Sequence, residues 1–244
     1  MKLNCDLGES FGAWKMGMDQ AVMPLIDMAN VACGFHASDP LTIFDTVRLA
    51  KEYDVEIGAH PAYPDLVGFG RRSMKCTKEE LLSLIWYQIG ALEGVCRANG
   101  TQVSYIKPHG ALNNDMMSDT ELLSTVMQAT KAYGDITLMI PVTRAYREHQ
   151  KMAEQLGLTL VLEAFADRAY TDEGLLVPRS EANSVYHESK DIVGQALSFA
   201  RDGGVYSRTG KWLDLPAESL CIHGDNDSSI QATSDIRDAL SGLK

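Results

Sequence analysis

Short apolar runs alternate with longer amphipathic stretches along the whole chain, and this rhythm constrains the fold more than any other feature. Most of the runs are continuously apolar, as expected of strands that are buried on both faces. The strand candidates lie at residues 2–6, 28–33, 55–59, 103–107, 136–140, 159–164 and 219–223. Stretches with helical period lie between them, at residues 40–53, 78–99, 119–133, 143–156, 187–202 and 228–240.

This alternation predicts an α/β protein in which crossover helices join parallel strands. Seven strands are compatible with a closed or nearly closed barrel and with an open, doubly wound sheet. A length of 244 residues fits a barrel of one domain, so we expect a single domain over residues 1–244. Residues 203–216 contain Thr209-Gly210 between β-rich flanks and predict a small hairpin inserted before the last strand.

Two helix starts carry a local sequence pattern. Thr77 precedes Glu80 by three residues, and Ser118 precedes Glu121 by the same spacing. A hydroxyl residue followed at this spacing by a glutamate is typical of a capping box at the N-terminus of a helix. The sequence therefore predicts that Thr77 and Ser118 are N-caps.

The charge balance narrows the class of partner. Lys and Arg number 22 against 33 Asp and Glu, a formal net charge of −11. Such a field repels phosphate backbones and anionic lipids, so we expect neither nucleic acid nor a membrane as partner. No apolar run approaches the ~18–20 residues of a membrane helix, and the first residues lack the apolar core of a signal peptide. Five cysteines without a CxxC pair favour a reducing cytoplasm.

Ionisable residues gather where the strand candidates end. Loops at the carboxyl ends of parallel strands converge, so residues there are expected to share one site. His149 and His187 lie on helix candidates and are expected at the surface. The other histidines lie at strand ends: His36, His60, His109 and His223.

The motifs exclude several chemistries. The chain has no GxxxxGK[ST] phosphate loop, no GxGxxG after the first strand and no GxSxG elbow. Carboxylates, imidazoles and Lys107 remain, which suit acid–base chemistry on a polar carbonyl substrate or a divalent metal. Zinc or manganese takes ligands of these types, but no HExxH or other close pair is present, so a metal stays open and no residue is assigned as its ligand.

Arginines and cysteines near the strand ends allow two interpretations each. Arg71, Arg72 and Arg168 are able to clamp a carboxylate or phosphate, or to form ion pairs within loops. Cys5, Cys33 and Cys221 lie within strand candidates, where a buried thiol is expected rather than a nucleophile.

Six segments carry a resemblance to a known family: LNCDLGESFG (3–12), ANVACGFHASD (29–39), IGAHPAYPDLVGFGRR (57–72), IKPHGALNND (106–115), FADRAYTDEGLLVPRS (165–180) and CIHGDND (221–227). The chain resembles the LamB/YcsF family. The resemblance implies a seven-stranded parallel (β/α) barrel of the glycoside hydrolase/deacetylase type. It also implies a component of an ATP-dependent 5-oxoprolinase, which opens the lactam of 5-oxo-L-proline to L-glutamate and releases ADP and phosphate. ATP is then a co-substrate, and 5-oxoprolinase subunits B and C are the partners.

The motif positions of the family fall on Asp6, Glu9, His36, Asp39, His60, Asp65, Lys107, His109, Asp167, Arg168, Arg179, His223 and Asp225. Among these and neighbouring residues we expect catalytic roles for Asp6, His60, Lys107 and His109. We expect substrate contacts from Asn4, Glu9, His36, Asp39, Arg71, Arg168, His223 and Asp225. Ser38 departs from the pattern, which has glycine there.

A mechanism consistent with the resemblance uses Asp6 or His60 as base toward water and His109 as acid toward the lactam nitrogen. Lys107 and Arg168 would then stabilise anionic oxygens. Because the chain has no nucleotide-binding motif, the ATP chemistry is expected to depend on the partner subunits. Two alternatives stay open: a metal-dependent amide or carbohydrate deacetylase, and a non-catalytic subunit that binds the lactam.

Overall fold

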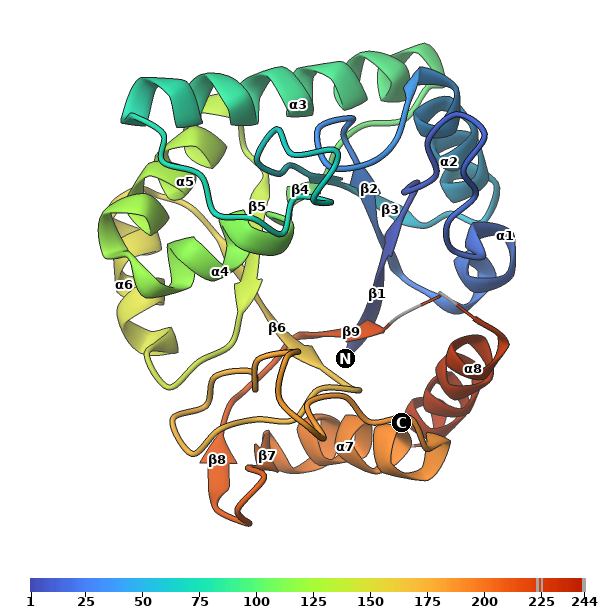
Figure 1. Ribbon diagram of the computed structural model, residues 1–244, viewed down its shortest axis with the longest axis vertical. Helices are drawn as coiled ribbons and strands as arrows, with labels where there is room; N and C mark the ends of the chain where they lie inside the picture. The colour runs from blue at the N-terminus through green and yellow to red at the C-terminus, as the bar shows by residue number, and fades with distance from the viewer. Residues whose placement is uncertain (223, 225, 243–244) are drawn as a thin grey trace.

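Seven parallel strands form a closed barrel in the computed structural model, which describes residues 1–222, 224 and 226–242. β9 pairs with both β6 and β1 and so closes the ring, which confirms the predicted barrel and rejects the open sheet. The strands follow the chain order around the barrel (Figure 1): β1 (Lys2–Leu7), β2 (Met28–Ala32), β3 (Glu56–His60), β4 (Tyr105–Ile106), β5 (Thr137–Pro141), β6 (Leu160–Phe165) and β9 (Ser219–Ile222).

Helices surround the barrel on its outer side (Figure 1). All six predicted helices are present, with ends shifted by up to a few residues, and α1, η1 and α4 were not predicted. None of the described helices is both long and apolar enough to span a membrane. The helices are α1 (Asp19–Val22), η1 (Met23–Leu25), α2 (Pro40–Glu52), α3 (Lys78–Ala98), α4 (Gly110–Ser118), α5 (Thr120–Tyr133), α6 (Tyr146–Gln155), α7 (Ser189–Asp202) and α8 (Asp227–Ser241).

The predicted hairpin is present as two antiparallel strands, β7 (Gly204–Tyr206) and β8 (Trp212–Asp214). Its turn contains Gly210, whose φ of 88° lies in the left-handed region that glycine adopts without strain. The hairpin lies between α7 and β9, as the sequence predicts.

Of the two predicted N-caps, one is confirmed and one is wrong. The Thr77 side chain accepts a hydrogen bond from the Glu80 amide, and the Glu80 side chain accepts one from the Thr77 amide. At the start of α5, however, Asp119 is the N-cap, and its carboxylate accepts bonds from the amides of residues 121 and 122. Ser118 is instead the last residue of α4, and its hydroxyl donates to carbonyls of the preceding turn.

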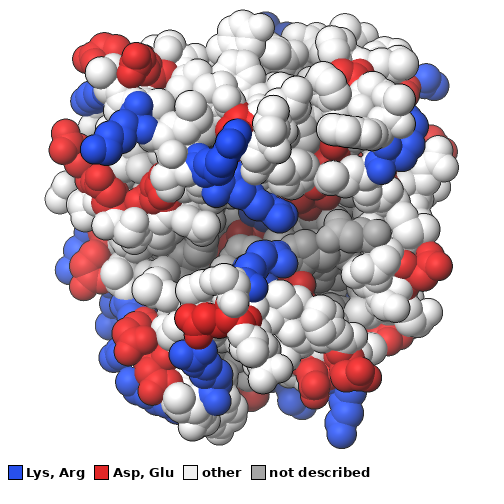
Figure 2. Space-filling view, viewed as in Figure 1, with Lys and Arg blue, Asp and Glu red and all other residues white. Residues whose placement is uncertain are grey.

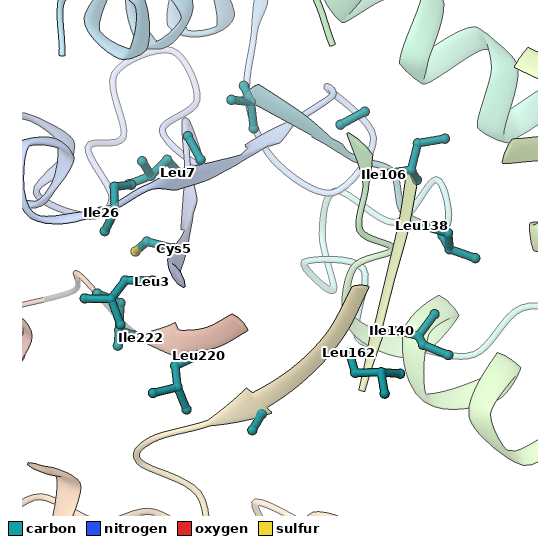
Figure 3. Close-up of a cluster of buried hydrophobic side chains, with 14 of the residues drawn as sticks. Leu3, Cys5, Leu7, Ile26, Ile106, Leu138, Ile140, Leu162, Leu220 and Ile222 are labelled. Carbon is teal, nitrogen blue, oxygen red and sulfur yellow. The ribbon is translucent and has the colours of Figure 1, made fainter. Parts of the chain in front are cut away.

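The main apolar core lies between the strands and the helices. In Figure 3 Leu138, Ile140 and Leu220 point away from the barrel axis toward the surrounding helices. Each is fully buried, and burial of a side chain of this size stabilises the fold by about 1.5–3 kcal/mol. Outward side chains of the strands therefore hold the helices, which leaves the inward positions available for other residues.

The side chains that point into the barrel change from apolar to polar along its axis. Met28, Tyr105 and Met139 fill the lumen near the amino-terminal ends of the strands. Gly58 makes room for Tyr105, because a Cβ at this position would lie 2.2 Å from the tyrosine ring. Farther along the strands the inward residues are polar, and two of them, Asn4 and Asn30, are completely buried. Polar residues at buried positions need partners, so this layer is expected to form a hydrogen-bonded network.

The N-cap of α2 generates a stability prediction. The Asp39 carboxylate accepts bonds from the amides of Leu41 and Thr42 and from that of Gly12 in the β1–α1 loop. These bonds hold the pKa of Asp39 at about 2. Asp39→Ala is expected to lower the free energy of unfolding in urea by about 1 kcal/mol, whereas Asp39→Asn, which also caps, stays within a few tenths. Equal stability of the two variants would contradict the capping role.

Burial of the thiols generates a second prediction. All five cysteines are free, and four of them, Cys5, Cys33, Cys96 and Cys221, are buried. Burial raises the pKa of Cys33 to about 12, so the reactive thiolate is scarce at neutral pH. In a thiol titration with Ellman's reagent at pH 8, we expect fast reaction of Cys76 alone and loss of that phase in Cys76→Ser. Fast labelling of a second thiol in the native protein would be inconsistent with this packing.

Candidate active site

A large cavity opens at the carboxyl ends of the barrel strands, with a volume of about 1250 Å³. Figure 2 shows the molecule from this direction, with Lys and Arg side chains gathered around the hollow in the middle of the face. The structure brings eight of the predicted site residues to the cavity lining: Asp6, Glu9, His36, His60, Arg71, Lys107, His109 and Arg168.

Lys107 is the buried cation at the floor of the cavity. It follows β4, and its Nζ lies 2.9 Å from Oδ1 of Asp6 and 2.7 Å from Oε1 of Glu163. The ammonium also donates to Oδ1 of Asn4 at 3.2 Å and contacts Sγ of Cys221 at 3.3 Å. Strands that lie far apart in the sequence thus supply the partners of the Lys107 ammonium. A buried charge is tolerated in the interior only when it is paired in this way.

Opposite charges keep both members of the Asp6–Lys107 pair ionised. Burial by itself raises the pKa of Asp6, but His60 and Lys107 outweigh it and hold that pKa well below its usual range. Burial likewise lowers the pKa of Lys107, but Asp6 and Glu163 raise it well above the usual value. The floor therefore presents a carboxylate and an ammonium across the neutral pH range.

Amide side chains fix the orientation of Asp6. Nδ2 of Asn30 donates to Oδ1 of Asp6 and to Oδ1 of Asn4, both at 2.8 Å. The Tyr105 hydroxyl in turn donates to Oδ1 of Asn30 at 2.7 Å. With its Oδ1 held by Asn30 and Lys107, Asp6 directs Oδ2 toward His60 at 3.3 Å.

Three histidines pack together beside Asp6. Nε2 of His60 lies 2.9 Å from Nδ1 of His109, and the rings of His36 and His109 stack with their centroids 3.8 Å apart. Nδ1 of His60 donates to the Lys107 carbonyl oxygen at 2.6 Å, and Nε2 of His109 donates to that of Phe69 at 2.9 Å. Backbone carbonyls therefore fix both ring orientations.

The environment of His36 and His109 favours uncharged rings. Burial, and next the neighbouring His60, lower the pKa of His109 to about 3. Burial, and next His109, lower the pKa of His36 well below its usual value. A neutral His109 whose Nε2–H is engaged by Phe69 is better suited to present a lone pair at Nδ1 than to act as the acid expected from the sequence.

Glu9 completes this group from the loop after β1. Its Oε1 lies 3.4 Å from Nε2 of His36. One possible ligand atom from each of Glu9, His36, His60 and His109 lies within 4.8 Å of the others, so these four residues could hold a metal ion. The sequence contains no closely spaced pair of metal ligands, and the fold brings these four donors together from separate loops and strands.

Arginines form the upper wall of the cavity. Arg168 is buried and donates to the backbone carbonyls of Ser184 and Val177. Burial, and next the nearby Arg179, lower its pKa below the usual value. Arg71 lies over the Phe69 ring at 5.0 Å from the centroid. Both side chains line the cavity and could meet an anionic group there.

Several predicted residues have structural positions outside the lining. Asp39 caps α2, Asn4 lies beneath the floor as a partner of Lys107, and Arg72 forms a loop ion pair with Asp65. His223 and Asp225 lie outside the described residues. His149 is half-buried rather than at the surface, so that expectation was wrong, whereas His187 is exposed.

Sequence reasoning did not assign three residues that shape the floor: Asn30, Tyr105 and Glu163. Asn30 and Glu163 each interrupt an otherwise apolar strand, and this interruption is the pattern that could have identified them. Tyr105 lies in a two-residue strand and carries no such signal. The backbone at Ser38 also explains why the family pattern has glycine at this position. Its φ of 78° lies in the left-handed region, where the glycine of the family pattern is favoured.

Comparisons with known proteins agree with this architecture. The model of the LamB/YcsF family matches residues 1–243. The chain is 53% identical over 242 residues to the A subunit of 5-oxoprolinase from Chromohalobacter salexigens, covering 99% of this chain and 97% of that one. It is 54% identical to the protein of the same name from Pseudomonas fluorescens, covering 98% and 96%.

A solved structure shares the fold over the whole chain. The crystal structure of a lactam utilization protein from Thermus thermophilus superposes with a TM-score of 0.92 at 39% identity, covering 100% of this chain and 96% of that one. The extent of these matches, together with the closed seven-stranded barrel and its polar cavity, leads to one conclusion. The chain belongs to the LamB/YcsF family.

Proposed function

We propose that this chain is the A component of an ATP-dependent 5-oxoprolinase, which hydrolyses the lactam of 5-oxo-L-proline to L-glutamate while ATP is converted to ADP and phosphate. The names of its relatives support this proposal. The observation that carries it is the grouping of Asp6, His60 and Lys107 at the cavity floor. There an imidazole and an ammonium both lie within contact distance of one carboxylate, close enough to act on one bound substrate.

The reaction needs such a site. A lactam is a resonance-stabilised amide, so its hydrolysis calls for activation of the carbonyl, placement of water and stabilisation of developing negative charge. Phosphorylation of the lactam oxygen by ATP would make the ring carbon electrophilic and phosphate a leaving group. Water then attacks that carbon, and the ring nitrogen takes a proton as the C–N bond breaks, which leaves an acyl phosphate on the opened chain. A second water hydrolyses this acyl phosphate to glutamate and phosphate.

The described geometry supports a division of roles on the floor. Oδ2 of Asp6 and Nε2 of His60 lie 3.3 Å apart and form the basic side toward water. The Lys107 ammonium stabilises the oxyanion, and Arg168 and Arg71 in the wall meet the substrate carboxylate or the transferred phosphate. The proton that the basic side takes from water is then available to the ring nitrogen, since the lowered pKa of His109 leaves that imidazole without a proton to give.

The cavity is larger than this substrate needs. Pockets for drug-sized ligands occupy about 300–1,000 Å³, and 5-oxoproline is smaller than such ligands. A volume of about 1250 Å³ therefore leaves space for a nucleotide phosphate or for a segment of a partner. Because no nucleotide-binding motif is present in the sequence, we propose that subunits B and C bring the ATP chemistry to this opening.

Exposed apolar side chains surround the opening and are suited to that contact. Val67 is 93% exposed and Trp14 78% exposed, and both belong to the cavity lining. Large exposed apolar groups around a functional opening are typical of protein interaction sites. We define the apolar rim as Phe11, Trp14, Leu66, Val67 and Leu175, and propose that a partner subunit covers it. We place the assembly in the cytoplasm, where the free thiols stay reduced.

Reconstitution tests the proposed reaction. With subunits B and C, glutamate and ADP are expected to form in equal amounts, and the chain alone is expected to be inactive. Asp6→Asn and His60→Gln should each lower kcat about 10²–10⁴-fold, because each removes a group that handles protons. His187→Gln, an exposed histidine away from the cavity, is the matched control and should retain full turnover.

Other results would support the alternatives. Turnover of the lactam by the chain alone would contradict the role proposed for the partners. Release of acetate from N-acetyl substrates without ATP would indicate a deacetylase. Variants that weaken lactam binding in calorimetry but leave kcat unchanged would indicate a non-catalytic binding subunit.

Charge placed in the apolar rim tests the partner contact. Trp14→Glu and Val67→Glu are each expected to weaken assembly with the partners about tenfold or more, measured as Kd by sedimentation. Tyr53→Glu is the control, since this tyrosine is exposed at the C-terminal end of α2, away from the opening. Unchanged assembly in both rim variants would refute the location of the interface.

A further inference from the structure

We propose that Glu9, His36, His60 and His109 form a binding site for one divalent transition-metal ion, with zinc as the ion that the donor set fits best. Three imidazoles and one carboxylate are a common zinc ligand set, and these four residues each place a possible ligand atom within 4.8 Å of the others. Nothing in the relatives' names speaks of a metal. The inference follows from the hydrogen positions that the site permits.

The tautomers of His60 and His109 are determined by their outer partners. A backbone carbonyl only accepts hydrogen bonds, so the ring nitrogen that faces it must carry the hydrogen. Nδ1 of His60 faces the Lys107 carbonyl oxygen at 2.6 Å, and Nε2 of His109 faces that of Phe69 at 2.9 Å. When such a ring is neutral, its other nitrogen carries a bare lone pair.

These two lone pairs point at each other. Nε2 of His60 and Nδ1 of His109 lie 2.9 Å apart. The next neighbour, Oδ2 of Asp6 at 3.3 Å from Nε2 of His60, is also an acceptor and has no hydrogen to offer. Three acceptors that converge in this way repel one another unless a positive charge lies among them. That charge is either a proton shared by the two imidazoles or a metal ion.

His36 distinguishes between these two possibilities. It is 1% exposed, and neither of its ring nitrogens has a hydrogen-bond partner among the residues that the structure describes. Its Nε2 lies 3.4 Å from Oε1 of Glu9 and on the same side as the other donors. A shared proton between His60 and His109 leaves His36 unsatisfied, whereas a metal ion gives its nitrogen a ligand bond.

The outer hydrogen bonds also match those of a metal centre. A metal-bound histidine almost always donates its second ring N–H to a carbonyl or carboxylate, which fixes the ring. His60 and His109 both donate in this way to backbone carbonyls. Tetrahedral donors at normal zinc distances lie about 3.3 Å apart, so small side-chain shifts bring the four donors to an ion.

A cation at this position lies beside the carboxylate of Asp6 and would act as a Lewis acid toward a carbonyl oxygen in the cavity. The metal site itself is independent of the proposed lactam reaction, because binding can be measured without lactam, ATP or partners. The two proposals can therefore fail separately.

Metal binding to the purified full chain tests the inference. After treatment with a chelator and its removal, the chain is titrated with Zn²⁺, and with Co²⁺ as a probe whose visible d–d absorption reports the geometry. We expect about one equivalent of each, with intense cobalt bands typical of four-coordination. Mg²⁺, which prefers six oxygen ligands, should not compete.

Variants locate the ion. His36→Gln and His109→Gln are each expected to weaken Zn²⁺ binding at least about tenfold and to alter the cobalt bands. His187→Gln is the control and should bind as the original chain does, with circular dichroism to verify that every variant is folded. Binding unaffected by His36→Gln, or no stoichiometric binding of Zn²⁺ or Co²⁺, would overturn the proposal.

Nitrogen NMR of the histidines provides a measurement that does not depend on variants. With Zn²⁺ present, Nε2 of His60 and Nδ1 of His109 should show the shifts of metal-bound nitrogens. A proton that stays between these atoms when Zn²⁺ is in excess would show that the pair is a hydrogen-bonded dyad, and the metal site would be refuted.

Discussion

The ion pairs of Lys107 inside the barrel are the interaction on which the rest of the site depends. A buried ammonium is tolerated only when it is paired, and removal of a partner from such a pair typically costs about 3–5 kcal/mol. Asp6 and Glu163 supply the charges, the Asn4 amide oxygen accepts from the ammonium, and the Asn30 amide donates to Asp6. The same contacts that stabilise the lumen therefore hold Asp6 in one orientation toward the cavity.

Closure of the barrel makes this network possible. β9 pairs with β1 on one side and β6 on the other, which brings Glu163 within reach of a lysine that also contacts Asp6. Outward side chains pack against the helices, so the inward side chains are free to be polar without loss of the main core. A small apolar cluster below, with Tyr105 seated over Gly58, separates this polar layer from the far end of the barrel.

The floor of the cavity has two parts with different chemical states. Around Lys107, opposite charges are paired, and contacts from Asp6, Glu163 and Asn4 hold the ammonium before any ligand arrives. Beside it, the inner nitrogens of His60 and His109 face each other at 2.9 Å, and the buried imidazole of His36 has no hydrogen-bond partner among the described residues. The ion-paired part orients Asp6, and the histidine part is the one in which the proposed cation would lie.

The sequence by itself determined the alternation of strands and helices, because hydrophobic period is a local property, and it located the histidines of the cavity because carboxyl ends of parallel strands converge. It missed Asn30 and gave no role to Glu163, because both lie inside apolar runs and acquire meaning only when Lys107 lies opposite. It also grouped Asp39 with the substrate contacts, since a carboxylate near a strand end looks the same in sequence whether it caps a helix or faces a ligand. Tertiary structure decided these points, because partners, tautomers and ion pairs depend on which distant side chains the closed barrel brings within a few ångströms.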